Sequence, residues 1–483
     1  MNFRTIFWLV GIVSGAVALS QTLALAVAVA LGEPWLPFAN TIAAGLGLAA
    51  LAILPARRGE LALDHRSAFL AVTLSWTAAC MLGAGPYFHH PALQLNALDA
   101  LFESVSGFTT TGATVLSGLD GMPRSVLLWR SLTQWLGGMG IVLLGVAVFP
   151  ILGLGGMQLY RAETPGPTKD KITPRIAETA KLLWMLYLGL TLACVALLWI
   201  GGMTPFDAIC HAMCAISTGG FSTSDASLDH FDSGFIHMVM TGAMLLGGMS
   251  FAVLHRALTR GISWRDSPEL RLYLGIFAAA TLLLAVDLRL DAPEQFASGA
   301  EALEHAALQA ASIMTTTGFT TRNFVLWPPL SHAVIFALIF VGGMAGSTGG
   351  GIKVIRVLIT VKVAVAQFFR LVHPHGFSAI RLGGRTVDDD VILGVVGFVG
   401  MWFVLLFAGT VAIAAFGSDL LTSFSAAAVT LGNIGPGFAG VGPANTYAGF
   451  SAAAKLSMVA LMVLGRLEIY TALVILTPRF WRR

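Results

Sequence analysis

The chain has 483 residues, of which 56% are hydrophobic and 11% are charged, and its formal net charge is +3. A soluble domain carries roughly 25% charged residues and has too little interior to bury so much apolar surface. The composition therefore excludes a soluble globular protein and predicts a membrane protein in contact with lipid. We expect no nucleic acid among its partners.

Apolar runs long enough to cross a bilayer occur along the whole chain. A spanning helix needs about 20 apolar residues, and runs of this length cover residues 6–31, 392–416 and 452–476. The first run is longer than the core of a signal peptide, about 7–15 residues, so we interpret it as a retained helix. These runs predict an all-α polytopic membrane protein.

Four short segments of the chain resemble one another. Three of them have threonine shortly before a glycine, and the fourth is divergent. The four segments end at Gly112, Gly220, Gly318 and Gly435. Nine positions before each glycine lie Glu103, His211, Gln309 and Ala426. A second glycine motif follows each segment, as Gly137-Gly138-Met139, Gly247-Gly248-Met249, Gly342-Gly343-Met344 and Leu464-Gly465-Arg466.

Each copy predicts the same unit: a long helix, a short helix, a glycine-containing loop and another long helix. The short helices span roughly 10–13 residues, too few to cross the bilayer, so each loop must return to the side it entered from. Non-helical backbone at that depth must be buried in protein or face water. Matched offsets in four copies argue against ordinary interhelical turns. The units are expected at residues 63–150, 175–258, 268–371 and 388–477, around one pseudo-fourfold pore.

The loops have the chemistry of a cation filter. Rings of backbone carbonyls replace the water shell of K⁺, and glycine permits the backbone angles that such a strand needs. The C-terminal ends of the short helices add partial negative charge. The predicted K⁺ ligands are Thr111, Gly112, Gly219, Gly220, Thr317, Gly318, Asn433, Ile434 and Gly435. The register of the fourth loop is open by one residue.

These motifs resemble the Trk/Ktr/HKT superfamily, and specifically the bacterial Trk-type potassium uptake membrane subunit. The resemblance rests on Thr-Thr-Thr-Gly-Ala at 109–113, Ser-Thr-Gly-Gly-Phe-Ser at 217–222, Thr-Thr-Thr-Gly-Phe-Thr-Thr at 315–321 and Gly-Asn-Ile-Gly-Pro-Gly at 432–437. Two further motifs are Gly-Gly-Met-Ala-Gly-Ser-Thr-Gly-Gly-Gly-Ile-Lys at 342–353 and Gly-Arg-Leu-Glu at 465–468.

The resemblance implies a homodimer with one K⁺ pore per subunit. It also implies a cytoplasmic ring of nucleotide-binding subunits that gates the pore, and an extra N-terminal helix pair at residues 1–56. Some plant relatives that admit Na⁺ carry serine at the first filter position, where this chain has Gly112, so K⁺ selectivity is expected. The resemblance thus implies K⁺ as the transported ion, and no organic cofactor is expected in this chain.

Two features break the symmetry of the repeats and are candidate gates. A glycine-rich run interrupts one long helix, and each glycine there costs about 1 kcal/mol of helix stability. This run and the lysine after it comprise Gly346, Ser347, Thr348, Gly349, Gly350, Gly351 and Lys353. The second feature is Arg466, which takes the place of methionine in the other copies and is expected to face the cavity below the filter. The alternatives are a simple kink for the run and a structural ion pair for Arg466.

The charge distribution predicts the orientation in the membrane. Lys and Arg gather in alternate loops and at the C-terminus, which the positive-inside rule places in the cytoplasm. The acidic loop at residues 225–232 then faces outward. We expect a multi-pass protein of the bacterial inner (plasma) membrane. Residues 158–181 and 373–385 are candidate contacts for the regulatory ring, or plain linkers.

Other function classes fit the sequence less well. A K⁺ symporter coupled to H⁺ or Na⁺ on the same scaffold stays open as an alternative. An inverted-repeat secondary transporter predicts opposed halves and a charged midplane site, whereas these repeats run in the same direction. A membrane enzyme needs clustered catalytic side chains, so no enzymatic activity is expected. Cys210, His211 and Cys214 are close together but lack a fourth ligand for a metal.

Overall fold

The computed structural model describes residues 1–56, 64–147, 176–261, 267–373 and 379–482. Within these ranges the chain is helical, apart from connecting segments and a short antiparallel hairpin of β1 (Arg381–Leu382) and β2 (Arg385–Thr386). The predicted all-α membrane fold is confirmed. Among the described residues, six helices are long and apolar enough to span a membrane, or up to eight spans result if two bent pairs each count as one.

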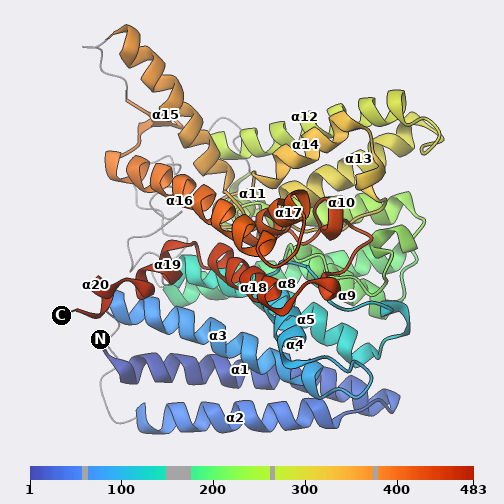
Figure 1. Cartoon of the computed structure of the whole chain (residues 1–483), viewed down its shortest axis with the longest axis vertical. Helices are drawn as coiled ribbons and strands as arrows, with labels where there is room; N and C mark the ends of the chain where they lie inside the picture. Colours follow the sequence, from blue (N-terminus) through green and yellow to red (C-terminus); the bar gives the residue numbers. More distant parts are fainter. Residues whose placement is uncertain (57–63, 148–175, 262–266, 374–378, 483) are drawn as a thin grey trace.

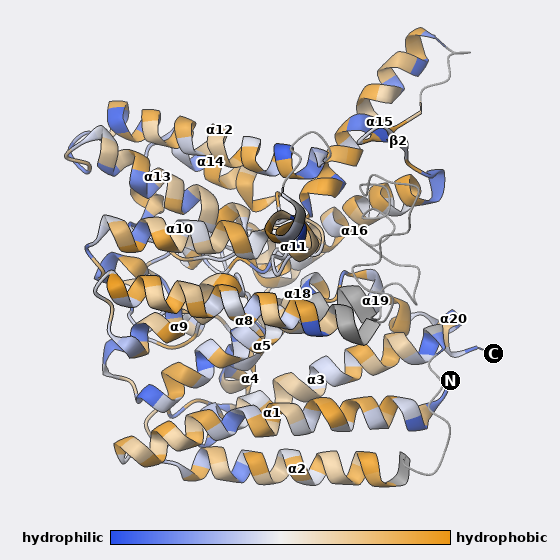
Figure 2. Cartoon of the chain, turned by 180° about the vertical axis from the view of Figure 1, so that it is seen from behind, coloured by the Kyte–Doolittle hydropathy of each residue, from blue (hydrophilic) through white to orange (hydrophobic). Residues whose placement is uncertain are grey.

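Two long helices come before the first of the four repeated units in the chain. α1 (Phe3–Leu31) packs along α2 (Leu36–Ala56) and also along α3 (His65–His89), so that the three form one edge of the molecule (Figure 1). The Asn2 side chain caps α1 by accepting the N–H of Thr5, and Gly32 ends it in the left-handed conformation. Figure 2 shows hydrophobic residues along most of the length of these helices, as a lipid-facing surface requires.

The rest of the chain repeats one order of elements four times. The first copy is α3, α4 (Ala97–Phe108) and α5 (Arg124–Ala147). The second is α8 (Ile176–Ile200), α9 (Pro205–Ile216), α10 (Gly234–Gly248) and α11 (Phe251–Arg260). The third is α12 (Pro268–Asp291), α13 (Gly299–Met314), α14 (Pro329–Ile339) and α15 (Val354–Val372). The fourth is α16 (Asp389–Ala414), α17 (Leu420–Leu431), α18 (Ala452–Arg466), α19 (Tyr470–Leu473) and α20 (Pro478–Trp481).

Short 3₁₀ turns lie in the connecting segments. They are η1 (Leu119–Gly121), η2 (Ser227–His230), η3 (Phe324–Leu326), η4 (Ala439–Val441), η5 (Tyr447–Gly449) and η6 (Val474–Leu476). The first five follow the four short helices in sequence, and η6 lies between α19 and α20.

The four short helices begin in the same way. A polar N-cap side chain accepts a backbone N–H in the first turn of each, which satisfies one of the donors left free at a helix start. The caps are Asn96, Thr204, Ser298 and Asp419. The helices have 12, 12, 16 and 12 residues, so that of the third copy is longer than expected and all four are too short to span.

Two long helices break where the sequence gives an unbroken apolar run. α10 bends by 106° into α11, and α18 bends by 111° into the segment 470–476. The apolar run at 452–476 is therefore not one straight span as predicted. After α18 the chain turns through Glu468 and Ile469, which have φ angles of +60° and +50°. Two consecutive non-glycine residues in this region cannot continue a right-handed helix.

α15 projects from the body of the molecule on the same side as both chain termini (Figure 1). Hydrophilic residues gather near many of the helix ends and connecting segments (Figure 2). Some of the Lys and Arg residues that predict the orientation lie outside the described residues, namely Arg57, Arg58, Arg161, Lys169, Lys171, Arg175, Arg265 and Arg483. The same holds for 158–175 of the first candidate contact segment and 374–378 of the second.

Candidate functional site

The four short helices end in one shared backbone motif. The second residue after each helix has a positive φ angle, between +52° and +61°, at Thr110, Thr218, Thr316 and Asn433. The next N–H reaches back five residues to a carbonyl, with N···O distances of 2.8–2.9 Å, in the pairs Thr111–Ser106, Gly219–Cys214, Thr317–Ser312 and Ile434–Val429. This is a Schellman motif, which satisfies carbonyls at the end of a helix.

Threonine is an unusual residue for the left-handed position of that motif. Glycine normally occupies it, and a β-branched side chain there is a conformational outlier that costs about 1–3 kcal/mol. Three copies nevertheless carry threonine, and the fourth carries asparagine. Strain held at the same position in three copies, with a residue that tolerates this conformation in the fourth, makes these turns the candidate functional site.

The glycine two residues further on has a positive φ angle in every copy. The values are +79° at Gly112, +81° at Gly220, +91° at Gly318 and +93° at Gly435. Alternation of two positive-φ residues with a residue between them gives the four loops the same backbone path. Only glycine adopts these angles without steric cost.

The four glycines meet the neighbouring loops in cyclic order. A Cβ atom added to Gly112 would collide with the carbonyl oxygen of Gly219, one on Gly220 with that of Thr317, and one on Gly318 with that of Ile434. The fourth contact returns to the first copy, since a Cβ on Gly435 would lie 2.6 Å from the carbonyl oxygen of Thr111. The four loops therefore form a closed ring of backbone around one axis.

The ring fixes the register of the fourth loop, which the sequence left open by one residue. Gly435 corresponds to Gly112, so Ile434 corresponds to Thr111 and Asn433 to Thr110. Asn433 is thus in the turn rather than beside the ring glycine. Its Nδ2 donates a hydrogen bond of 3.0 Å to Thr111 Oγ1, which joins the fourth copy to the first, and another of 3.0 Å to the Met462 carbonyl within the fourth copy.

Threonine hydroxyls support two of the loops from behind. Thr109 and Thr111 are joined by a hydrogen bond of 2.8 Å between their Oγ1 atoms, and Thr315 and Thr317 by one of 2.7 Å. All four side chains are fully buried. Because each pair is joined through side-chain hydroxyls, it holds the loop in place without occupying the backbone carbonyls of the loop.

The glycine-rich run packs against the turns that support this ring. Residues 340–353 are not helical and connect α14 to α15. Gly350 N–H donates to Thr316 Oγ1 at 2.6 Å, and the hydroxyls of Thr348 and Thr218 are 3.2 Å apart. A Cβ on Gly350 would lie 2.9 Å from that of Asn433. The run therefore contacts the positive-φ turn residues of the second, third and fourth copies.

Arg466 joins the same assembly from the fourth copy. Its side chain is buried, and Nη1 donates to the Thr348 carbonyl at 2.7 Å while Nη2 donates to the Gly137 carbonyl at 3.0 Å. Lys353 donates to the carbonyl of Gly349. Both cations thus bind carbonyls of or near the glycine-rich run, while the carboxylate of Glu468 pairs with Arg356.

The other predicted gate residues shape the glycine-rich run itself. Gly346 and Gly351 have φ angles of +76° and +66°, and Ser347 Oγ donates to the Met344 carbonyl at 2.7 Å. A Cβ on Gly349 would lie 3.0 Å from the Thr315 carbonyl oxygen. The run is a folded loop with its own turns rather than a kink between two helices.

The structural equivalent of Arg466 differs by one residue from the sequence comparison. Gly465 packs against the Leu431 carbonyl as Gly137 packs against that of Phe108 and Gly247 against that of Ile216. Arg466 therefore replaces Gly138 and Gly248 rather than the methionines that follow them. Sequence comparison did not distinguish the two glycines of each pair, because only packing on the short helix identifies the first.

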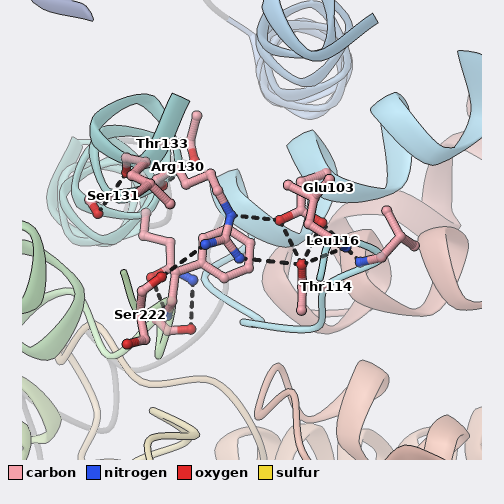
Figure 3. Close-up of polar contacts among 12 residues, drawn as sticks. Glu103, Thr114, Leu116, Arg130, Ser131, Thr133 and Ser222 are labelled. Atoms are coloured by element: carbon pink, nitrogen blue, oxygen red, sulfur yellow. Dashed lines mark hydrogen bonds and ion pairs between the residues drawn. The ribbon is translucent and has the colours of Figure 1, made fainter. Parts of the chain in front are cut away.

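A buried ion pair lies behind the first loop and was not predicted. Glu103 Oε1 and Arg130 Nε are 2.9 Å apart, with both side chains almost completely buried (Figure 3). In the sequence, Glu103 is distinguished only by its place nine positions before the first ring glycine. Arg130 is a charged residue within an apolar helix, which is itself a sequence signal for a functional site.

The cluster Cys210, His211 and Cys214 is part of the packing behind the second loop. His211 Nδ1 is 2.8 Å from the Asp207 carbonyl oxygen, and its Nε2 is 3.0 Å from Ser222 Oγ. The two cysteines are buried and free. Within the described ranges, no group of three His, Cys, Asp or Glu residues is placed to hold a metal ion.

The fold and this site define a class of protein: a multi-pass helical membrane protein with a ring of loops at its centre. The family model described as TrkH, cation transport protein, matches residues 37–482, and the chain belongs to this family. The prediction of a Trk-type membrane protein is thereby confirmed. Members of the family are transport proteins, in agreement with the expectation that the chain is not an enzyme.

Individual relatives match over the whole chain. The Trk system potassium uptake protein TrkH of Salmonella typhimurium is 42% identical over 491 residues, covering 100% of both chains, and that of Escherichia coli K12 is 41% identical with the same coverage. TrkG of Escherichia coli K12 is 34% identical and covers 88% of this chain and 87% of its own. The crystal structure of the potassium transporter TrkH from Vibrio parahaemolyticus superposes with a TM-score of 0.91 at 38% identity, covering 100% of both chains.

Proposed function

We propose that this chain is the potassium-conducting membrane subunit of a Trk-type K⁺ uptake system. The observation that carries the proposal is the closed ring of Gly112, Gly220, Gly318 and Gly435, each packed against a carbonyl of the next loop. Relatives named as potassium uptake proteins match the whole chain. In this proposal the units 63–150, 175–258, 268–371 and 388–477 each contribute one loop to the pore.

The proposed filter is built from pairs of residues in matching positions. They are Thr111 with Gly112, Gly219 with Gly220, Thr317 with Gly318, and Ile434 with Gly435, while Asn433 holds the turn behind them. Carbonyl oxygens replace the hydration shell of K⁺. The four short helices end at this ring, so their C-terminal partial charges favour a cation there without a carboxylate in the filter.

The proposed gate is the glycine-rich loop together with Arg466 and Lys353. Gly350 and Thr348 contact the turn residues that hold the filter, and Arg466 ties Thr348 to Gly137 of the first copy. A fixed positive charge just below a cation filter opposes the passage of K⁺. In the proposal this arrangement is the closed state, and the loop must move for ions to pass.

The partners remain part of the proposal. We place the chain in a bacterial inner membrane, as a homodimer, with its termini and the end of α15 on the cytoplasmic side. α15 carries exposed apolar side chains at helical spacing, Val361, Val365, Phe368 and Leu371, which supports a covering partner there. A ring of nucleotide-binding subunits on the same side would control the loop.

Rubidium uptake in a cell deficient in potassium transport tests the proposed function. The chain should restore uptake, and K⁺ should compete much more strongly than Na⁺. Equal competition by the two ions would defeat the proposal of a K⁺ filter. Gly318 packs against the Ile434 carbonyl, so Gly318→Ser should alter the ratio of K⁺ to Na⁺ competition. An unaltered ratio would contradict the placement of the filter.

A further inference from the structure

The ion pair of Glu103 and Arg130 occupies the junction between the first and second loops. Glu103 is on the short helix α4, nine residues before Gly112, and Arg130 is on α5. The corresponding residues of the other copies, His211, Gln309 and Ala426, carry no carboxylate. The buried carboxylate therefore belongs to one junction of a ring that is otherwise built from similar parts.

The carboxylate holds the chain just beyond the first ring glycine. It accepts hydrogen bonds from Thr114 Oγ1 at 2.9 and 3.0 Å and from the Val115 N–H at 3.0 Å. These residues follow Gly112 by two and three positions. Charge-assisted bonds of this kind are shorter and stronger than neutral ones, so Glu103 fixes the outer end of the first loop.

The guanidinium extends the same network to the second loop. Arg130 Nη1 donates to the Ser222 carbonyl at 2.9 Å, Nη2 lies 3.3 Å from Thr114 Oγ1, and the group sits 4.1 Å from the centre of the Phe221 ring (Figure 3). Ser222 follows Gly220 by two positions. One side chain thereby connects equivalent points on two neighbouring loops, which a planar guanidinium does and a lysine ammonium does not.

A second residue of α5, one helical turn after Arg130, also binds the second loop. Gln134 Nε2 donates to the Gly219 carbonyl at 2.6 Å, and its Oε1 accepts the Phe221 N–H at 3.0 Å. Arg130 and Gln134 are four residues apart and so share one face of the helix. α5 of the first copy thus forms hydrogen bonds with the second loop on both sides of Gly220.

We infer that Glu103 and Arg130 are positioning residues for ion selectivity, which fix the first and second filter loops relative to each other and so set the discrimination between K⁺ and Na⁺. This inference rests on the proposed filter. Selectivity requires carbonyls at a defined spacing and stiffness, and the pair joins two loops at a point just outside their ring glycines. Neither side chain needs to touch the ion.

A double variant separates positioning from simple folding. Glu103→Gln or Arg130→Met alone leaves a buried charge without its partner and should lower the melting temperature. Glu103→Gln with Arg130→Met removes both charges, so the melting temperature should recover. The K⁺/Na⁺ ratio of rubidium-competition uptake should remain about tenfold below wild type, the loss expected for one charge-assisted hydrogen bond.

Two further variants sharpen the comparison. Arg130→Lys keeps the charge but loses the simultaneous contacts with Glu103, Thr114 and Ser222, so it should lower the K⁺/Na⁺ ratio with a smaller loss of stability. If the double variant does not reach the membrane, this variant alone tests the positioning role. Gln309→Met is the matched control, because Gln309 is a fully buried residue at the same register in the third copy. It should leave the ratio at the wild-type value.

The outcomes distinguish the inference from the proposed function. A wild-type chain without K⁺ preference overturns both. A selective wild type with a ratio fully restored in the double variant, or unchanged in Arg130→Lys, overturns the positioning role alone. An equal loss in Gln309→Met would assign the effect to general packing behind the ring and would also overturn it.

Discussion

The guanidinium of Arg466 donates a hydrogen bond of 2.7 Å from Nη1 to the main-chain carbonyl of Thr348. The two residues are 118 positions apart and come from the end of α18 and from the glycine-rich loop. Through this bond and a second one to Gly137, the fourth copy holds the loop of the third copy against the helix of the first. The glycine-rich loop is therefore held by hydrogen bonds from Arg466 as well as by its own turns.

Replacing Arg466 should free the glycine-rich loop from these hydrogen bonds. Arg466→Ala loses two charge-assisted hydrogen bonds, each contributing about 1.5–3 kcal/mol, so rubidium flux should rise by about tenfold or more. Single-channel recording or flux into proteoliposomes measures the change. Arg289→Ala, at an exposed arginine near the end of α12, should leave the flux unaltered. An unchanged flux in Arg466→Ala would argue for a purely structural role.

Thr348 should act through the same loop as Arg466. Thr348→Val keeps the main-chain carbonyl but removes the hydroxyl, whose oxygen lies 3.1 Å from the Ile216 carbonyl and 2.9 Å from that of Gly247. The flux should therefore rise, and the double variant with Arg466→Ala should rise less than the product of the two single effects, because both act on one element. Independent, multiplicative effects in a double-mutant cycle would contradict a common gate.

The ring glycines should tolerate no side chain. Gly318→Ser places a Cβ against the Ile434 carbonyl at a φ angle of +91°, so the ring must shift. A backbone distortion of about 1–3 kcal/mol at the filter should lower the K⁺/Na⁺ uptake ratio by roughly tenfold or more. Gly275→Ala is the matched control in the same copy, since an added Cβ there meets nothing within 4 Å. A similar loss in that control would point to general damage.

A second ion pair joins the fourth copy to the first and should contribute to stability. Lys455 Nζ lies 2.6 Å from Asp99 Oδ1, with side-chain exposures of 6% and 16%. Asp99→Asn should destabilise the protein by about 2 kcal/mol, because it leaves a nearly buried ammonium without its partner. Thermal unfolding in detergent measures the loss.

An exposed pair provides the comparison for Asp99. Asp229 lies 3.4 Å from Arg322, with both side chains more than 40% exposed. Asp229→Asn should therefore change the stability by less than about 1 kcal/mol, since water screens the pair. Equal losses in the two variants would show that burial of the Lys455–Asp99 pair adds nothing to its contribution.

Local features of the sequence determined the class, the repeats and the ring glycines. A low charged fraction and long apolar runs are sufficient to predict a membrane protein, because the bilayer selects for them directly. The threonine–glycine pattern located Gly112, Gly220 and Gly318, since backbone angles restricted to glycine leave a trace in the sequence. Gly435 followed from the repeat offset even where the fourth loop diverged.

Tertiary structure decided the features that depend on contacts between distant copies. The place of Asn433 in the turn, the equivalence of Arg466 to Gly138, and the breaks after Gly248 and Arg466 all follow from packing on neighbouring loops. The same holds for Glu103 and Arg130, which are 27 residues apart but meet behind the first loop. A sequence records which residue types occur at intervals, whereas closing a ring requires each copy to fit the next.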